Sequence, residues 1–282
     1  MSSVSLSGLS LVAVRPSDEV AIQQWYEVCH TVARADWPDD PPPCRINELG
    51  RIRHPWPGED ETVWLARLGG SDSGDSDSGD SVVGGCLLNL PTLDNLQNAT
   101  GDIVVPSEHR RRGIGRMLLD HLRAQAAGQG RIRLIGQVDQ PLDLAAPDPG
   151  GRFVATSGAE LALVETRRRL DVGSVDPVAL ARLDEQARVR SGGYSLVQWV
   201  GSTPERWLDG IAYLTGRMVT DAPMDDLKWE AEAYDATRMR EREASCLARG
   251  LHTVTTGALD DAGRLVAFTR IIGYATSPWY AE

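Results

Sequence analysis

Apolar residues in the first half of the chain follow two different periods. Short apolar runs of strand length cover residues 6–14, 62–68, 82–90 and 101–106. Residues 20–33, between the first two runs, have the period of a helix. After the fourth run, apolar side chains recur every four positions, at Ile114, Leu118, Leu122 and Ala126. The pattern predicts a mixed domain whose fourth strand leads through a short loop into a helix that ends near Gly128.

The second half of the chain repeats part of this pattern. Ser10-Leu11-Val12 recurs as Ser195-Leu196-Val197, and farther on Thr62-Val63 recurs as Thr253-Val254. The matches occur in the same order in both halves, which predicts two copies of one folding unit. Because each matching string is short, chance similarity is the alternative interpretation.

Residues 71–81 separate the second and third strand-like runs and read SDSGDSDSGDS. Without an apolar side chain, this segment cannot offset the entropy lost on ordering, so the sequence predicts a disordered hairpin loop. A calcium site is the alternative, since Asp and Gly alternate. That alternative is weakened because no terminal Glu follows at the spacing of a calcium loop.

Composition narrows the class of protein. The net charge of −11 over 282 residues disfavours a nucleic-acid or anionic-membrane partner for the whole chain. No apolar run has the length of a membrane span, and the N-terminus lacks the basic region of a signal peptide. The four cysteines are not spaced as a metal or disulfide framework. We therefore expect a cytoplasmic protein without a metal, and the use of Arg in place of Lys indicates a bacterial source.

The strongest chemical signal lies where the fourth strand leads into the helix, at residues 107–115, SEHRRRGIG. A helix N-terminus leaves backbone N–H groups without acceptors and directs the positive end of its dipole outward. Gly113 and Gly115 lack the Cβ atoms that would keep an anion away from the backbone. Three arginines, residues 110–112, add positive charge and forked donors. The sequence therefore predicts a pyrophosphate-binding loop.

Other motifs fit this segment less well. A Walker loop requires Gly-Lys-Ser/Thr, which is absent, and a dinucleotide fingerprint requires a third glycine and a position early in the chain. Two alternatives stay open for the basic run at residues 109–112, a solvated helix start and a nucleic-acid patch.

The arrangement Arg110-x-x-Gly113-x-Gly115, after a strand and before a helix, resembles the cofactor motif of the GNAT acetyltransferase superfamily over about residues 9–171. The resemblance implies an α+β fold of three layers, α/β/α, around a mixed, largely antiparallel twisted sheet with a parallel, splayed pair at the cofactor site. It also implies a fifth strand at residues 131–138, a short helix at 151–157 and a final pair of strands that includes 161–170. The chain as a whole resembles actinobacterial tandem-GNAT proteins with a truncated second unit.

The same resemblance implies acetyl-CoA as co-substrate. The backbone of the fourth strand would pair with the pantetheine arm through Ile103, Val104 and Val105, and the N–H of Val105 would face the thioester oxygen. The loop and the start of the helix would hold the pyrophosphate through Arg110, Arg111, Arg112, Gly113, Ile114, Gly115 and Arg116.

The catalytic residues are less well marked. Asp102 lies near the strand position where relatives carry a carboxylate and is the candidate general base, with a solvated strand residue as the alternative. Many relatives have a general-acid Tyr on the short helix, but the aligned residue here is Val154. Ser157, one turn on, is the candidate acid, and a helix-terminal polar residue is its alternative.

Acidic and aromatic side chains that would suit a cationic amine follow the first helix. The candidates for acceptor binding are Trp37, Asp39 and Glu48, with Asp36, Asp40 and Trp56 nearby. Because prolines surround several of them, rigid turns are an equally good interpretation.

We therefore expect a GNAT domain at residues 1–172, a linker helix at 173–193 and a partial second unit at 194–282 without a cofactor motif. The expected function is acetyl-CoA-dependent N-acetylation of a primary amine, on a small molecule or a peptide. The alternative is a non-catalytic module that binds acyl-CoA or a partner. The fourth strand of the second unit is expected to fall beyond Glu282, so one coenzyme A should bind per chain. The uncovered apolar side of that unit predicts packing against the first unit or a homo-oligomer.

Overall fold

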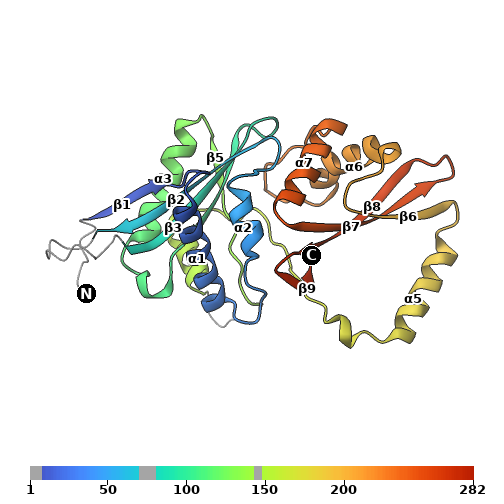
Figure 1. The fold of residues 1–282 in the computed structure, drawn as a ribbon, viewed down its shortest axis with the longest axis horizontal. Coiled ribbons are helices and arrows are strands. Elements are labelled where there is room, and N and C mark those ends of the chain that lie inside the picture. The colour runs from blue at the N-terminus through green and yellow to red at the C-terminus, as the bar shows by residue number, and fades with distance from the viewer. Residues whose placement is uncertain (1–7, 70–80, 143–147) are drawn as a thin grey trace. The chain divides into compact units, whose positions relative to one another are not determined.

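The computed structural model describes residues 8–69, 81–142 and 148–282. The chain forms two compact units (Figure 1). The first comprises residues up to Ala159 together with Glu241–His252 and Gly273–Glu282, and the second comprises Glu160–Arg240 and Thr253–Ile272. No helix among the described residues is both long and apolar enough to cross a membrane.

The first unit is built on a five-stranded sheet whose strands follow chain order. They are β1 (Leu9–Ala13), β2 (Glu59–Leu68), β3 (Ser81–Pro91), β4 (Asn98–Val104) and β5 (Arg133–Ile135). Consecutive strands pair antiparallel except β4 and β5, which are parallel. This confirms the predicted mixed sheet with one parallel pair. The fifth strand is shorter than the predicted 131–138, because only three of its residues pair with β4.

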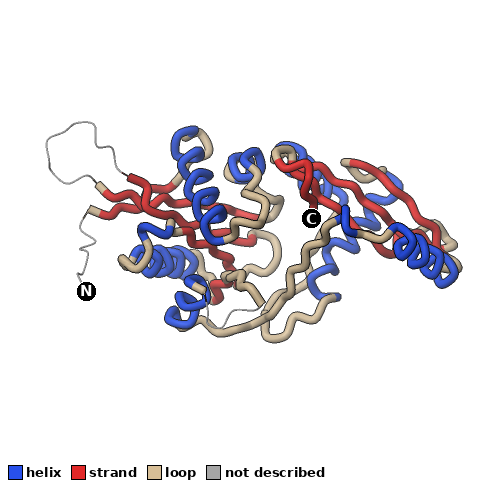
Figure 2. The backbone as a smooth tube through the Cα atoms, turned by 90° about the horizontal axis from the view of Figure 1, so that it is seen from below, coloured by secondary structure: helices blue, strands red, loops and turns tan. Residues whose placement is uncertain are grey.

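Helices cover both faces of this sheet, as Figure 2 shows. On one face, α1 (Glu19–Asp36) contributes Ile22 and Trp25 to a core with Val63, Leu65 and Leu87, and Leu49 of α2 (Arg45–Arg51) packs against it. On the other face, α3 (Ile114–Gly128) packs its apolar stripe, Ile114, Leu118, Leu122 and Ala126, against Cys86 and Leu88. The helix α4 (Pro149–Ser157) is joined to α3 by hydrogen bonds from Arg116 and Arg123 to its last carbonyls. The predicted three-layer architecture is therefore confirmed.

Local sequence signals explain where these elements start. Asp18 caps α1 by accepting a hydrogen bond from the N–H of Ala21 at 2.9 Å. Asp148 caps α4 in the same way, and Pro149 occupies the first helical position, where no N–H donor is needed. The 3-10 turn η1 (Ser107–His109) precedes α3, which begins after Gly113 in a left-handed conformation.

The hairpin predicted around residues 71–81 is present, since β2 and β3 pair antiparallel with Leu68 opposite Ser81. The loop itself, at residues 70–80, lies outside the described residues, so neither the predicted disorder nor the calcium alternative can be compared with the structure.

The final strand predicted at residues 161–170 is wrong. The segment is extended but pairs with no strand of the described chain, and its side chains Leu161, Val164 and Leu170 are largely exposed. The carbonyl of Ala162 accepts a hydrogen bond from the N–H of Asp226 at 3.0 Å, and Asp226 lies in a loop. The apolar residues suit a strand, but a strand forms only where a neighbouring edge satisfies its N–H and C=O groups.

The second repeat of the sequence follows the 3-10 turn η2 (Val172–Ser174) and the helix α5 (Pro177–Arg190). Its elements are β6 (Tyr194–Val200), η3 (Glu205–Trp207), α6 (Leu208–Asp221), α7 (Ala236–Ala248), β7 (Leu251–Asp260), β8 (Leu265–Tyr274) and β9 (Ser277–Ala281). Most of α7 and all of β9 belong to the first compact unit. The strands form a sheet of order β6-β7-β8-β9, and a core of Trp199, Trp207, Ile211 and Met239 lies at α6 and α7.

The repeated strings occupy equivalent elements. Ser10–Val12 lies in β1 and Ser195–Val197 in β6, while Thr62-Val63 lies in β2 and Thr253-Val254 in β7. The prediction that the fourth strand of the second unit would be missing is wrong. It is present as β9, which pairs antiparallel with β8 at Gly273↔Ala281 and Tyr274↔Ser277. The five residues of β9 are too few to show the alternation of apolar and polar side chains that marks a strand in a sequence.

Candidate active site

The loop between β4 and α3, residues 110–113, has two residues with positive φ and is here named the nest. Arg111 has φ 62° and Gly113 has φ 87°, so left-handed residues alternate with other conformations just before the helix. Such an alternation turns successive N–H groups toward one concave side. The first turn of α3 adds N–H groups that have no intrahelical acceptor, together with the positive end of the helix dipole. A left-handed non-glycine residue costs on the order of 1 kcal/mol and is typical of functional loops.

The arginines of this loop divide into two kinds. Arg111 and Arg112 are exposed beside the nest, and Arg116 on the first turn of α3 reaches the carbonyl of Thr156 at 3.3 Å. Arg110 is instead held by the protein. Its Nε donates to the carbonyl of Val105 at 2.8 Å, and its two terminal nitrogens donate to the carboxylate of Asp36 at 2.9 and 2.6 Å. The three exposed arginine heads are therefore the ones that can face a phosphate.

The edge of β4 beside this loop is open. Only Asn98, Ala99 and Thr100 pair with β5, so the remainder of β4 up to Val104 has no partner there among the described residues. Unpaired N–H and C=O groups at a strand edge can bind an extended amide chain as an added strand. The predicted residues Ile103, Val104 and Val105 thus end at the nest, with Ile103 and Val105 packed toward α3 and Val104 toward α1.

Gly115 does not face the nest as freely as the motif suggests. A Cβ atom placed there would lie 3.3 Å from Cε2 of Phe153 on α4. The absence of a side chain at this position therefore serves the packing of α3 against α4. Substitutions that test the anion site are better placed at the exposed Arg111 and Arg112.

A cluster of charged side chains lies on the opposite face of β4, beneath α1 and α2. The strand register places Val63, Leu87 and Asp102 side by side across β2, β3 and β4. Arg51 of α2 makes a two-pronged hydrogen bond to Glu61 of β2, at 2.9 and 2.8 Å. It also lies 3.7 Å from Glu48, one turn earlier on α2. The side chain of Glu61 is 7% exposed, and that of Glu48 is 14% exposed.

Burial and nearby negative charge make the carboxylates of Asp102 and Glu48 more basic. Burial raises the pKa of Asp102, with Glu61 and Asp139 adding to the rise and Arg51 opposing it. Burial likewise raises the pKa of Glu48, which Arg51 lowers and Glu61 raises. Asp102 is crowded by protein but still reaches solvent. A reachable carboxylate with a raised pKa is suited to accept a proton.

Cys29 of α1 faces the same cluster but is not a nucleophile. Burial raises the pKa of its thiol well above the usual value, and Glu48 adds to the effect. The thiol is therefore protonated at neutral pH, where only a thiolate would attack. No group of three or more His, Cys, Asp or Glu side chains that could hold a metal occurs in the described part of the chain.

Ser157 is engaged at the end of α4. Its hydroxyl donates to the carbonyl of Val154 at 2.7 Å and accepts from the N–H of Ala159 at 3.2 Å. This is the geometry of a helix-terminal serine, followed by Gly158 in the left-handed conformation. The hydroxyl proton that a general acid would donate is thus already hydrogen-bonded to a backbone carbonyl.

The structure separates the acceptor candidates. Glu48 lies in the buried cluster, whereas Trp37 closes the C-terminal end of α1 and Asp39 is exposed in the following turn. Within the first unit, the ring of Trp56 is covered by the guanidinium groups of Arg242 and Arg249, 4.5 and 4.0 Å from its centre. Trp56 therefore already has cationic partners.

Sequence reasoning missed Arg51 and Glu61. Glu61 alternates with Val63 and Leu65, which marks it as an inward position of a strand. Arg51 follows Glu48 by one helical turn, so both belong to one face of α2. The charge of Glu61 at an inward position of the strand could have indicated a polar cluster. Its partner Arg51 could not be identified from the sequence, because it lies on another element.

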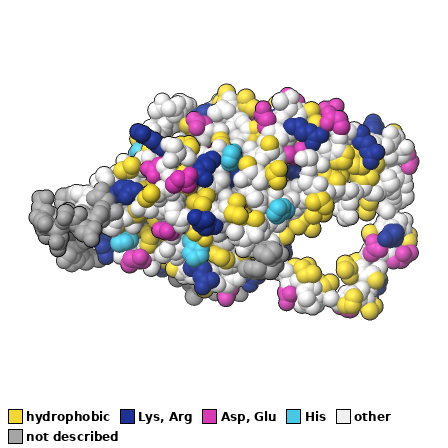
Figure 3. All heavy atoms as spheres, in the orientation of Figure 1, with side chains coloured by type: hydrophobic (Ala, Val, Ile, Leu, Met, Phe, Trp, Pro, Cys, Tyr) yellow, Lys and Arg dark blue, Asp and Glu magenta, His cyan; other side chains and the backbone are white. Residues whose placement is uncertain are grey.

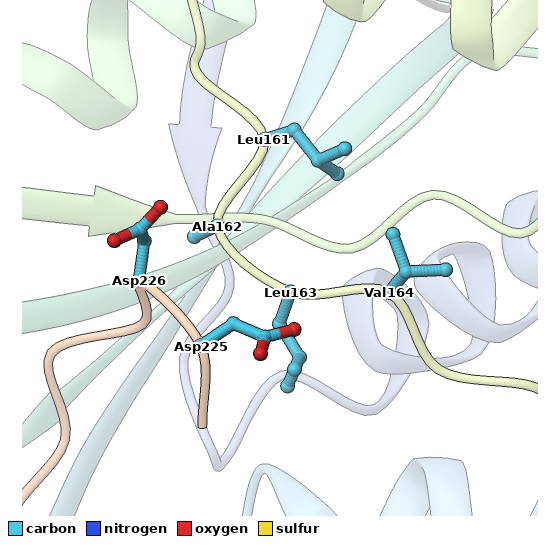
Figure 4. Close-up of a pocket in the computed structure, with 6 residues that line it drawn as sticks. All are labelled: Leu161, Ala162, Leu163, Val164, Asp225 and Asp226. Carbon is cyan, nitrogen blue, oxygen red and sulfur yellow. The ribbon is translucent and has the colours of Figure 1, made fainter. Parts of the chain in front are cut away.

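A pocket elsewhere in the chain does not belong to this site. It has a volume of about 440 Å³ and is lined by Leu161, Ala162, Leu163, Val164, Asp225 and Asp226, all in the second unit (Figure 4). Its two carboxylates point in different directions in Figure 4. It includes none of the residues of the loop, the β4 edge or the charged cluster.

Residues 20–146 match the model of the acetyltransferase (GNAT) family. This matched segment is a GNAT domain, and it contains the loop, the strand edge and the helix described above.

The chain as a whole is similar to a tandem GNAT protein from the clavulanic acid biosynthesis pathway, solved without AcCoA. The two share 27% sequence identity at a TM-score of 0.70, over 97% of this chain and 77% of that one. The repeat in the sequence thus corresponds to a tandem GNAT arrangement with a reduced second unit.

Two further solved structures align with lower scores. One is an aminoglycoside acetyltransferase from an uncultured soil metagenomic sample in complex with trehalose, with 17% identity over 58% of this chain and 98% of that one, at a TM-score of 0.42. The other is a ribosomal-protein-alanine N-acetyltransferase from Brucella melitensis biovar Abortus 2308, with 17% identity over 57% and 99%, at 0.40. Similarity at this level carries no inference about the acceptor. No curated protein sequence matches the chain significantly.

Proposed function

We propose that this chain is an acetyl-CoA-dependent N-acetyltransferase that acts on a primary amine of a small molecule or a peptide. The observation that carries the proposal is the juxtaposition of three features on one strand. The open edge of β4 ends at an anion nest, and the reachable carboxylate of Asp102 projects from the same strand toward α1 and α2.

The residues of the nest fit a pyrophosphate. Its backbone N–H groups, the start of α3 and the exposed side chains of Arg111, Arg112 and Arg116 would bind the two phosphates. The open edge of β4 would pair with the amides of the pantetheine arm. This places the thioester beside Val105, whose N–H is the candidate donor to the carbonyl oxygen as negative charge develops there.

The reaction requires an uncharged amine. Its nitrogen attacks the thioester carbon, a C–N bond forms, and the C–S bond breaks with release of the coenzyme thiolate. Asp102 accepts the proton that the nitrogen loses, and its raised pKa favours that transfer. The thiolate can leave without a protein acid, which agrees with a valine at position 154 and an engaged hydroxyl at Ser157.

The acceptor site would lie in the charged cluster. The carboxylates of Glu48 and Asp102 would attract an ammonium group, while Arg51 neutralises Glu61. We therefore expect cationic amines to be preferred over neutral ones. Trp37 and Asp39, at the end of α1, would contact only the outer part of an acceptor.

The experiment that tests the proposal measures thiol release from acetyl-CoA with a panel of amines. Asp102→Asn should lower kcat/KM by about 10²–10⁴-fold, the usual contribution of a general base, and leave the Kd for acetyl-CoA unchanged. Asp60→Asn, which changes an exposed carboxylate on β2, is the matched control and should leave both unchanged. Equal rates for Asp102→Asn and the unmodified protein would remove Asp102 from the mechanism.

The alternative is a non-catalytic acyl-CoA-binding module, and the engaged hydroxyl of Ser157 favours it. Binding of acetyl-CoA without thiol release across the whole panel would establish this alternative.

A further inference from the structure

Arg110 joins the end of β4 and the loop that follows it to the end of α1, which is distant in the sequence. Its Nε donates to the carbonyl of Val105, one residue beyond β4, and its terminal nitrogens grip the carboxylate of Asp36, the last residue of α1. Two parallel N–H···O bonds from a planar guanidinium to a carboxylate fix both distance and orientation. The side chains of Arg110 and Asp36 are only 22% and 32% exposed, so this pair is more sheltered than an ordinary surface ion pair.

The charge balance at this pair argues against a direct role for Arg110 at the pyrophosphate. The carboxylate of Asp36 neutralises the guanidinium, and three of the five N–H donors of the arginine are already used. The neighbouring Arg111 and Arg112 are exposed and supply the charge that the nest needs.

The position of Asp36 is unfavourable in the absence of its partner. A carboxylate at the C-terminal end of a helix is destabilised by the negative end of the dipole, by roughly 0.3–1 kcal/mol. The bonds to Arg110 explain how it is held there. The same bonds fix Arg110, which immediately precedes the left-handed Arg111. The nest is therefore preorganised before an anion binds.

We propose that Arg110 is a positioning residue, held by Asp36, which keeps the strand end at Val105 and the nest in the geometry that binds the pyrophosphate. This inference rests on the proposed function, because it assumes that the nest binds acetyl-CoA. It changes the role that the motif alone assigned to Arg110, from phosphate ligand to support of the loop.

The sign of one substitution separates the two roles. If Arg110 supports the loop, Asp36→Ala frees the guanidinium, loosens the nest and weakens acetyl-CoA binding by about tenfold, as expected for a displaced binding group. If Arg110 is a phosphate ligand that Asp36 restrains, the same substitution removes a competing negative charge and strengthens binding.

Calorimetric titration with acetyl-CoA measures this effect. Asp36→Glu keeps the carboxylate and should restore most of the affinity, and Arg110→Lys, which cannot form the fork, should weaken it. Glu27→Ala removes another carboxylate from α1 and is the control that should leave affinity unchanged. Thermal melting of each variant checks that the fold is retained.

A second substrate locates the effect. S-Acetyl-pantetheine lacks the pyrophosphate, so Asp36→Ala should change its KM less than it changes the KM for acetyl-CoA. Unchanged or tighter acetyl-CoA binding by Asp36→Ala would overturn the positioning role while leaving the proposed function intact. An unmodified protein that does not bind acetyl-CoA would overturn the proposed function, and this inference with it.

Discussion

At the scale of single residues, the candidate site depends on a few charges that tune one another. Arg51 lies among Glu48, Glu61 and Asp102, and its positive charge opposes the rise in pKa that burial produces at Glu48 and Asp102. Burial lowers the pKa of Arg51 itself, but the hydrogen bonds to Glu61 outweigh this and raise it overall. Arg51 therefore remains charged and limits how basic Asp102 becomes.

Removal of this charge should shift the pH dependence of the reaction. In Arg51→Gln the pKa of Asp102 rises further, because the opposing positive charge is lost. The ionised form of Asp102, which accepts a proton, is then reached only at higher pH. The acid limb of the plot of kcat/KM against pH therefore shifts to higher pH. Arg51→Lys keeps the charge and should move the limb less.

The same substitution leaves Glu61 buried without its partner. This should lower the free energy of unfolding by up to about 3 kcal/mol. The loss is smaller where water that enters at the partly exposed position 51 solvates Glu61. The double variant Arg51→Gln/Glu61→Gln removes the unpaired charge and should regain most of that loss in thermal melting. An acid limb that stays in place in a folded Arg51→Gln variant would show that Arg51 does not tune Asp102.

Arg111 allows the backbone of the nest to be tested apart from its charge. Its φ of 62° is easy for glycine, so Arg111→Gly keeps the loop conformation and removes only the side chain. We expect weaker acetyl-CoA binding that becomes less dependent on salt, with an unchanged or slightly higher melting temperature. Arg111→Ala, which loses the charge but retains the unfavourable φ, should melt below Arg111→Gly. Equal affinity at low salt for Arg111→Gly and the unmodified protein would exclude the side chain from the phosphate site.

At the scale of elements, the packing of α1 on the sheet requires a glycine. A Cβ atom at Gly85 of β3 would lie 2.8 Å from the carbonyl of Trp64 and 2.9 Å from Cζ3 of Trp25, the buried aromatic residue of α1. The indole of Trp25 thus rests directly on the β3 backbone. This contact sets how closely α1 approaches the sheet. It thereby also sets the space between α1 and the strands that carry the charged cluster.

Gly85→Ala should therefore push α1 away from β3 and destabilise the first unit by about 1–3 kcal/mol, which corresponds to several degrees in melting temperature. Gly128→Ala is the matched control, since a Cβ atom there meets nothing within 4 Å. It lies at the end of α3, where alanine favours the helix, so that variant should melt at the same temperature or slightly higher. Equal melting of both variants would show that α1 can shift without cost.

At the scale of the whole molecule, the two units differ in their helix N-termini. In the first unit, arginines flank the start of α3. In the second, Glu205 and Asp209 lie at the start of α6, and Asp235 caps α7 by accepting from the N–H of Arg238. Carboxylates at these positions compete with an anion for the N–H groups and repel it. On the face shown in Figure 3, acidic and basic side chains are interspersed.

We therefore expect one acetyl-CoA site per chain, formed by the loop before α3. Calorimetric titration should give a stoichiometry near one, and the double substitution Arg111→Glu/Arg112→Glu should abolish the signal. Heat of binding that persists in this variant with half the original stoichiometry would reveal a site in the second unit.

Much of the first unit could be predicted because its signals are local. The apolar stripe of α3, the hairpin strands around residues 71–81 and the glycine-rich junction each depend on residues close in sequence, whose period or backbone freedom fixes the conformation. The prediction failed at residues 161–170 and at β9, since a strand exists only where another strand offers an edge. The missing partner of the first is not encoded within a few residues. The second follows its neighbour β8 after a short turn, and it was missed because its five residues are too few to show a period.

The sequence by itself determined the order of elements from β1 to α3, the repeat and the position of the glycine-rich loop before α3, because each follows from spacing along the chain. Only the tertiary structure decided what the charged residues do. Asp36 and Arg110 are 74 residues apart and look independent in the sequence, yet folding joins them into one support for the loop. Arg51, Glu61 and Asp102 come from three elements, and their pKa values arise from distances and burial that exist only after those elements have packed.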